Sequence, residues 1–216
     1  MKLRFQTHPG PGKLIVICGS DGSGKTTLEN GLVAALAERG APVLATMQPT
    51  RWWREDLNVR HTIMREPVGE EVAQEAIALF ALADRYDHQR RVLEPALAAG
   101  KVVVCNRYVY SLFSYYMGCG GLDLDWLRDA AAFVYKPDFA VYLSLRAEDS
   151  VRRVIEREGA SAVAYDQVPE TVSSINEAFL QLAGANGMHV VSSADSPQAT
   201  LLETLGLMER DRVVGR

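Results

Sequence analysis

Five short runs of apolar, mostly β-branched residues recur along the chain, and most of them are continuous rather than alternating. They occupy residues 13–18, 42–47, 101–106, 139–145 and 188–193. A strand with one buried face alternates apolar and polar residues, whereas a strand that is covered on both faces is apolar throughout. The runs therefore predict five strands of a parallel sheet that has helices on both faces.

Between these runs, apolar residues recur at helical spacing over 26–40, 69–100, 124–135 and 169–187. We expect the second of these helices to be interrupted or kinked at Pro95. Strand and helix alternate along the whole chain, which predicts a three-layer α/β/α fold in a single domain of 1–216. At its ends and over its site we expect a flexible lead-in at 1–12, a polar tail at 207–216 and a loop with a short helix at 48–70.

Composition and charge argue against nucleic acid and membranes as partners of this chain. The 23 basic and 27 acidic residues give a net charge of −4, which argues against a protein that coats nucleic acid. No apolar run reaches the ~18–20 residues that span a membrane, and the first residues lack the apolar segment of a secretory signal. The three cysteines, Cys18, Cys105 and Cys119, lack metal-site spacing and are typical of reduced thiols in a cytoplasmic protein.

The stretch GSDGSGKTT, residues 19–27, fits the P-loop pattern G-x-x-x-x-G-K-[ST] between a predicted strand and a predicted helix. Glycines let successive backbone amides converge on an anion, and the helix N-terminus adds a favourable dipole. The lysine would bridge the β- and γ-phosphates of ATP, and the threonine after it would hold Mg²⁺. The predicted phosphate-binding residues are Gly19, Gly22, Ser23, Gly24, Lys25, Thr26 and Thr27.

A P-loop alone does not distinguish a kinase from a GTPase or a motor ATPase. The chain has neither a DxxG run after the second strand nor an NKxD run, which argues against a GTPase. Its length leaves little room for motor machinery. A small kinase that passes a phosphoryl group to an acceptor is therefore the favoured class.

Further motifs resemble the thymidylate kinase family from about Lys13 to about Thr204. The P-loop has an acid two residues after its first glycine, and TMQPTR, ALFALADRYDH, NRYVYSLFSYYMG and PDFAVYLSLRAEDSVRRVIER are similar to later motifs of the family. The resemblance implies a P-loop NTPase fold with a short helical lid at about 150–170. It also implies transfer of the ATP γ-phosphoryl group to dTMP with Mg²⁺, and a homodimer.

The resemblance assigns roles to single residues. Asp21 would bond the 3′-hydroxyl of the acceptor and Phe80 would stack on its base. Arg51 and Arg85 would hold the acceptor phosphate, and Arg107 would brace the phosphates of both substrates. The full set of expected acceptor-binding residues is Asp21, Pro49, Arg51, Phe80, Arg85, Arg107, Tyr115 and Tyr116.

The chain departs from the family pattern at several positions, four of which bear on the predicted roles. Phe80 stands five residues before the motif arginine, where the family has four, so either a helical bulge restores its position or another aromatic replaces it. Tyr116 replaces a glutamine near the base, and Asn106 replaces an aspartate that helps to hold Mg²⁺ through water. Gly22 stands where some relatives carry arginine. The positive charge that neutralises the transferring phosphoryl group would then come from the lid residues Arg153 and Arg157.

Two alternatives stay open. The first is a kinase of the same fold with another acceptor, such as a modified pyrimidine nucleotide. The altered base-side residues favour it, and Trp52 and Trp53 could line such a pocket. The second is a nucleotide-binding regulator with little catalysis, which Asn106 and a lid poor in arginine would support.

Overall fold

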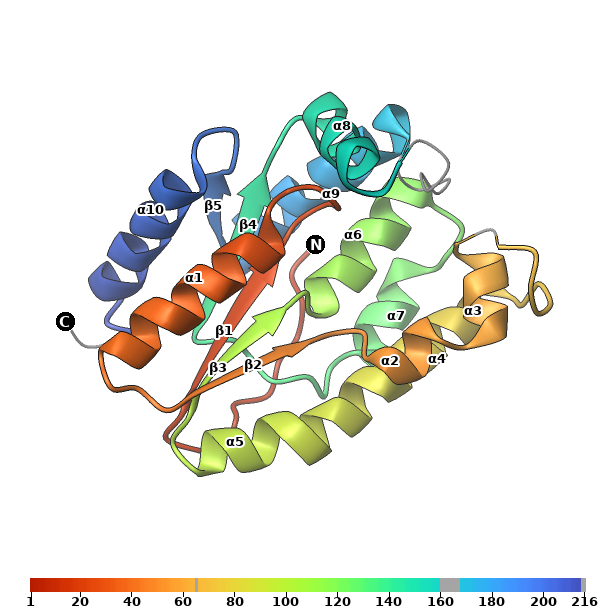
Figure 1. Ribbon diagram of the computed structural model, residues 1–216. Helices are drawn as coiled ribbons and strands as arrows, with labels where there is room; N and C mark the ends of the chain where they lie inside the picture. The colour runs from red at the N-terminus through yellow and green to blue at the C-terminus, as the bar shows by residue number, and fades with distance from the viewer. Residues whose placement is uncertain (65, 160–167, 215–216) are drawn as a thin grey trace.

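Five strands form one sheet in the order β2-β3-β1-β4-β5, and every neighbouring pair is parallel. The computed structural model describes residues 1–64, 66–159 and 168–214 (Figure 1). The predicted five-stranded parallel α/β sheet is confirmed. The strands are β1 (Lys13–Cys18), β2 (Val43–Met47), β3 (Val102–Asn106), β4 (Phe139–Ser144) and β5 (His189–Ser192).

The central strand β1 explains why the strand runs are apolar throughout. Successive side chains of a strand point to opposite faces of the sheet. Leu14 and Val16 belong to one core cluster, while Ile15 and Ile17 belong to the other, and all four are fully buried. Both faces of the sheet are thus covered, so the buried positions of β1 after Lys13 are all apolar.

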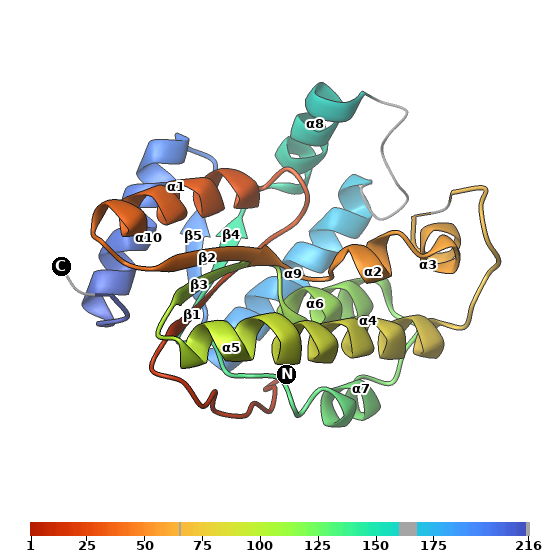
Figure 2. The same cartoon turned by 60° about the horizontal axis from the view of Figure 1, so that its bottom comes forward.

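Two layers of helices cover the sheet (Figures 1 and 2). Helices α1 and α10 pack on one face through leucines such as Leu32 and Leu205, and α4, α5, α6 and α9 pack on the other through residues such as Phe113 and Phe179. The helices are α1 (Lys25–Glu38), α2 (Arg51–Arg54), α3 (Leu57–Thr62), α4 (Gln74–His88), α5 (Glu94–Ala98), α6 (Val109–Cys119), α7 (Leu124–Ala130), α8 (Ala147–Glu158), α9 (Pro169–Asn186) and α10 (Pro197–Arg210).

The long helical stretch is continuous but changes its geometry before Pro95. Between α4 and α5, residues Gln89–Leu93 form a π-helical turn, and the amide of Glu94 donates to the carbonyl of Gln89. The proline ring has no N–H and would clash with the carbonyl four residues earlier in a regular helix. A wider turn at this point relieves the clash, which accounts for the expected interruption.

Packing involves both the segment 1–12, where a flexible lead-in was expected, and the described part of the polar tail, 207–214. Leu3 is buried and its amide donates to Asn186 Oδ1 at 2.8 Å, and Gln6 pairs with Tyr135 in an isolated bridge. At the other end α10 continues to Arg210, and Val213 is buried against the same core cluster as α1. Paired backbone groups and buried apolar side chains hold both segments, which the charged residues around them obscured in the sequence.

In a parallel sheet the carboxyl ends of all strands lie at one edge, and ligands bind in the crevice beyond that edge. The loops after β1, β2, β3 and β4 meet there, beneath α8 (Figure 1). The segment expected to form the lid, about 150–170, is described as α8 up to its C-cap, and residues 160–167 lie outside the described residues. In the part of the chain that the structure describes, no helix is both long and apolar enough to cross a membrane.

Candidate active site

The loop between β1 and α1 builds an anion site around a buried lysine. Gly22 and Gly24 have φ angles of 81° and 88°, which disfavour any residue with a Cβ. Lys25 starts α1, and its Nζ donates to the carbonyl of Ser20 at 2.7 Å and lies 3.4 Å from an Asp21 oxygen. Burial, and next the charge of Arg107, lower the pKa of Lys25 to about 7. An anion placed beside this ammonium would restore the stability of its charged form.

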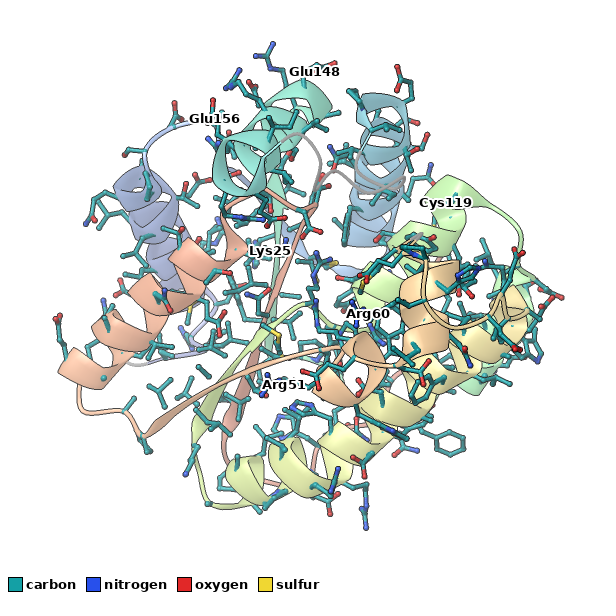
Figure 3. All side chains as sticks on the ribbon, turned by 45° about the vertical axis from the view of Figure 1, so that its right-hand side comes forward. Lys25, Arg51, Arg60, Cys119, Glu148 and Glu156 are labelled. Carbon is teal, nitrogen blue, oxygen red and sulfur yellow. The ribbon has the colours of Figure 1, made fainter. Side chains whose placement is uncertain are left out.

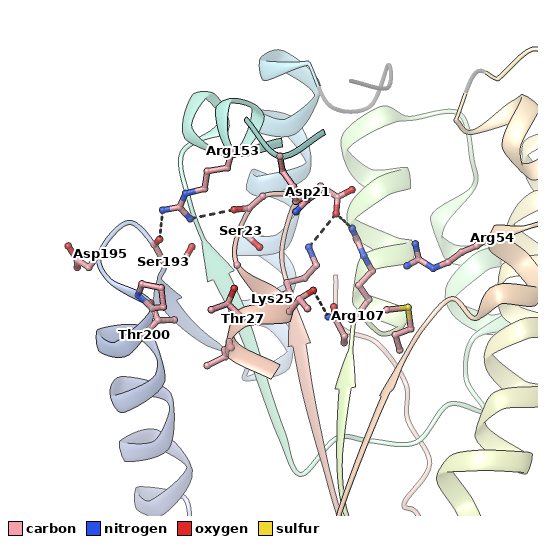
Figure 4. A pocket seen from close by; sticks show the side chains of 18 residues that line it. Asp21, Ser23, Lys25, Thr27, Arg54, Arg107, Arg153, Ser193, Asp195 and Thr200 are labelled. Atoms are coloured by element: carbon pink, nitrogen blue, oxygen red, sulfur yellow. Dashed lines mark hydrogen bonds and ion pairs between the residues drawn. The ribbon is translucent and has the colours of Figure 1, made fainter. Parts of the chain in front are cut away.

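The loop faces a cavity of about 810 Å³, a size typical of small-molecule sites (Figure 4). Six of the seven predicted phosphate-binding residues line it, and Gly19 lines a neighbouring hollow instead. Opposite the loop, the wall comes from the end of β5 and the start of α10. The other lining residues include Asp21, Met47, Arg54, Asn106, Arg107, Arg153, Arg157, Ser193, Asp195, Pro197 and Thr200.

A second hollow, of about 80 Å³, lies between the loop, α6, α8 and α9. Asp21 and Arg107 line both the cavity and this hollow, and they form an ion pair with each other. Arg107 adopts a left-handed φ of 64°, which is uncommon for a residue other than glycine, and its amide donates to the carbonyl of Ile17 at 2.7 Å. Its guanidinium is therefore aimed at the junction of the two spaces.

Three arginines lie close enough to interact near this junction, although Arg85 itself lines neither the cavity nor the hollow. Arg54, from α2, lines the cavity, and its Nε donates to the carbonyl of Pro49 at 2.9 Å. Arg85 is almost fully buried, it donates to the carbonyls of Ala81 and Tyr108, and its Nε has no hydrogen-bond partner among the described residues. Burial lowers the pKa of Arg54, and it lowers the pKa of Arg85 to about 10. The charge of Arg107 lowers both values further, and Arg54 also lowers the pKa of Arg85. A phosphate dianion would relieve this repulsion.

The structure does not bring Arg51 to the cavity. Its side chain is 90% exposed and pairs with Glu55 one turn later in the same helix, apart from Lys25 (Figure 3). The start of α2 is fixed by Thr50, which caps the helix and bonds Asp84 of α4 through both its amide and its hydroxyl. This anchor places Arg54, not Arg51, beside Arg107 (Figure 4).

The residues expected at the acceptor base are only partly brought together. Tyr115 lines the small hollow. Phe80 packs edge-on against Trp52, with ring centroids 4.9 Å apart, and no helical bulge lies between it and Arg85, because the π turn comes later. Tyr116 is buried and its hydroxyl donates to the carbonyl of Gln74 at 3.2 Å.

The lid helix α8 reaches the cavity through two arginines. Arg153 donates to the carbonyls of Gly22 at 3.4 Å and Ser193 at 3.1 Å, so it joins the P-loop to the loop after β5 (Figure 4). Arg157 also lines the cavity but pairs with Glu158 and is mostly exposed. Both predicted lid arginines are thus at the cavity, with Arg153 the more firmly held.

Gly22 is the point where α8 packs on the P-loop. A Cβ there would lie 2.3 Å from the carbonyl oxygen of Ser150, whereas a Cβ on Gly24 would meet nothing within 4 Å. We expect Gly22→Ala to lower the free energy of unfolding by about 1–3 kcal/mol more than Gly24→Ala, since both substitutions strain φ but only one also clashes with α8. Urea unfolding of the two variants without nucleotide measures the difference, and equal losses would contradict this packing.

The expected metal side of the site offers the hydroxyl of Thr26 and the amide of Asn106 rather than a full set of protein ligands. No cluster of three or more His, Cys, Asp or Glu residues suited to a metal occurs in 1–64, 66–159 or 168–214. Thr26 and Asn106 line the cavity together, and Asn106 Nδ2 lies 3.5 Å from Thr26 Oγ1. Such a sparse set suits Mg²⁺, which retains several waters and takes its remaining ligands from substrate phosphates.

The parallel sheet, the P-loop and the converging arginines define an ATP-dependent phosphotransferase. Comparison with known proteins narrows the class. The model of the thymidylate kinase family matches residues 17–202. The chain therefore belongs to the thymidylate kinase family, as its sequence predicted.

Individual relatives agree over most of the chain. A probable thymidylate kinase of Pyrococcus horikoshii is 38% identical over 174 residues, which cover 80% of this chain and 83% of the relative. A probable thymidylate kinase of Pyrococcus abyssi is 34% identical and covers 93% and 97% of the two chains. A thymidylate kinase of Xanthomonas campestris is 33% identical and covers 98% and 91%.

Sequence reasoning missed three residues at the site. Arg54 stands one turn after the arginine that was chosen, and the capping residue Thr50 was the available signal. Asn176 of α9 accepts from the Ser20 hydroxyl and donates to the carbonyl of Leu145 at 2.9 Å, so it ties the P-loop to the end of β4. Glu29 of α1 bonds Asn106. The last two are tertiary contacts without a local signature.

Proposed function

We propose that the protein transfers the γ-phosphoryl group of ATP to dTMP and releases ADP and dTDP. Membership of the thymidylate kinase family supports this acceptor. The observation that carries the proposal is the pair Asp21 and Arg107, which lines two spaces at once. One space is walled by the P-loop and the other by α6 and α9, so a donor and an acceptor would meet at this pair.

The protein's contribution is position and charge. ATP would sit on the P-loop, with its triphosphate against the amides of 22–27 and against Lys25. The acceptor phosphate would sit against Arg54, Arg85 and Arg107, whose mutual repulsion it would relieve. One of its oxygens would attack the γ-phosphorus in line while the bond to the β-phosphate oxygen breaks. No general base is needed, since a phosphate monoester with a second pKa of about 6 is largely ionised near neutral pH.

Thr26 would hold Mg²⁺ directly, and Asn106 would hold it through water. When bound, the ion neutralises charge on the β- and γ-phosphates. Arg153 and Arg157 would add positive charge from the lid. With α8 over the P-loop, water is kept from the γ-phosphate, which limits hydrolysis of ATP.

For the nucleoside part, we propose that Asp21 accepts from the sugar hydroxyl and that Tyr115 packs beside the sugar and base. Pro49 is buried and its carbonyl fixes Arg54, so its role is to position that arginine. Arg51, Phe80 and Tyr116 stay predictions from the resemblance, and their placement away from the cavity and the hollow argues against contact with the acceptor.

A second acceptor, another pyrimidine deoxynucleotide, is favoured by one observation. The position four residues before Arg85 is Ala81, which is small and buried, while Phe80 turns to Trp52. The stacking aromatic expected from the family is thus missing at that place.

A panel of monophosphates tests the acceptor. At matched concentrations we expect dTMP, the acceptor of the family, to be phosphorylated faster than dUMP or dCMP. We expect all three to react faster than AMP or GMP, because the hollow lined by Tyr115 is small and a pyrimidine ring is smaller than a purine ring. Coupled ADP release measures the rates. A faster rate with AMP or GMP than with dTMP would overturn the proposed acceptor, and a faster rate with a modified pyrimidine would select the second candidate.

The homodimer that the resemblance implies stays a prediction. Sedimentation of the purified chain at several concentrations would test it.

A further inference from the structure

Glu29 lies behind Asn106, next to the cavity rather than in its lining, and no motif includes it. It stands three residues after Thr26 on α1, a spacing that puts two side chains on the same face of a helix. Asn106 Nδ2, at the end of β3, donates to Glu29 Oε2 at 2.7 Å and lies 3.5 Å from Thr26 Oγ1. One amide group therefore contacts both the expected Mg²⁺ ligand and a carboxylate.

This contact determines which way the amide of Asn106 is turned. A carboxylate only accepts hydrogen bonds, so the NH₂ end of the amide must face Glu29. The other end, Oδ1, is then the atom with which Asn106 can accept a bond from a metal-bound water. With the amide reversed, two oxygens would face each other and no acceptor would be available to the water.

The contact also places a negative charge near the metal. Asn106 is neutral, but the Glu29 carboxylate that it is hydrogen-bonded to carries a negative charge. We infer that Glu29 and Asn106 act together as the metal-side group: Glu29 provides the charge and orients the amide, and Asn106 presents the oxygen. The inference rests on the proposed kinase function, because only a bound nucleotide completes the ligands of Mg²⁺.

Substitutions of Glu29 and Asn106 distinguish a metal-side role of the pair from a purely structural one. Glu29→Gln retains an oxygen that accepts from Asn106 but removes the charge, so a purely structural tie between α1 and β3 would survive it. The double variant Glu29→Gln/Asn106→Asp moves the negative charge from position 29 to position 106, which is closer to the expected metal. The amide at position 29 then donates the hydrogen bond and the carboxylate at position 106 accepts it. Asn106→Asp alone would place two carboxylates against each other, which raises the pKa of one of them and disturbs the pair.

Mn²⁺ bound to the protein·ADP complex, followed by electron paramagnetic resonance of free Mn²⁺, tests the pair without any turnover. We expect Glu29→Gln to weaken Mn²⁺ binding about tenfold, as loss of a group behind a metal ligand commonly does. The double variant Glu29→Gln/Asn106→Asp should recover most of that affinity. Glu38→Gln, at the exposed far end of the same helix, is the matched control and should bind Mn²⁺ like the wild type.

Two results would overturn the inference. One is Mn²⁺ binding by Glu29→Gln as tight as that of the wild type, and the other is a double variant as weak as Glu29→Gln alone. Neither touches the proposed kinase function. That function would fail separately if the wild-type protein with ADP held Mn²⁺ no more tightly than ADP alone.

Discussion

Lys25→Ala is expected to fold like the wild type and to transfer the phosphoryl group about 10²–10³ times more slowly. The ammonium is buried, and its pKa is lowered to about 7 in the absence of nucleotide. Such a group contributes little to folding, since burial opposes its charged form, but it becomes valuable when charge develops on the γ-phosphate. The measurement is the single-turnover rate with saturating ATP and dTMP.

Lys25→Met is the matched variant, because it fills the same space with a neutral side chain. Both variants should unfold at urea concentrations close to that of the wild type. A Lys25→Ala protein that retains more than about half of the wild-type rate would mean that the P-loop does not carry the catalysis.

Arg54→Ala is expected to lower kcat/KM for dTMP by about 10- to 150-fold, which corresponds to the loss of about 1.5–3 kcal/mol from one charged hydrogen bond. The effect should fall mainly on KM for dTMP and leave KM for ATP nearly unchanged, because Arg54 lies beyond Arg107, at the end of the cavity away from Ser193 and Asp195 (Figure 4). Steady-state kinetics with each substrate varied in turn make the distinction.

Arg51→Ala provides the control, since it removes an arginine from the same short helix whose side chain is 90% exposed and paired with Glu55. We expect it to change kcat/KM for dTMP less than about twofold, as is usual for an exposed ion pair. If Arg51→Ala had the larger effect of the two, the convergence of Arg54 with Arg85 and Arg107 would not form the acceptor-phosphate site.

The parts of the molecule that could be predicted from sequence depend on local patterns. The continuous apolar runs predicted the strands because each strand is covered on both faces, as Ile15 and Val16 illustrate. The P-loop was predictable because its glycines, its lysine and its neighbours in the chain define the anion site by themselves. The resemblance to the family, rather than a local pattern, pointed to Arg85 and Arg107. Arg107 lines both the cavity and the hollow, whereas Arg85 lines neither.

The remaining parts depend on contacts between segments that are far apart in the chain. Arg54 was missed because the choice between two arginines of α2 is made by Thr50 binding to Asp84 on another helix. Phe80 was expected at the acceptor base, but helical geometry turns it toward Trp52. The packed lead-in was missed because its hydrogen bonds join it to Asn186, Val134 and Lys136, which its own composition cannot indicate.

The most direct test of the whole account follows the γ-phosphorus itself. The protein is incubated with Mg²⁺, dTMP and ATP labelled at the γ-phosphorus, and the products are separated by chromatography. The account predicts that the label appears as the β-phosphate of dTDP, in amounts equal to the ADP released, and that ADP release nearly stops without dTMP. Label released as free phosphate at the same rate with and without dTMP, or label that stays in ATP, would contradict it.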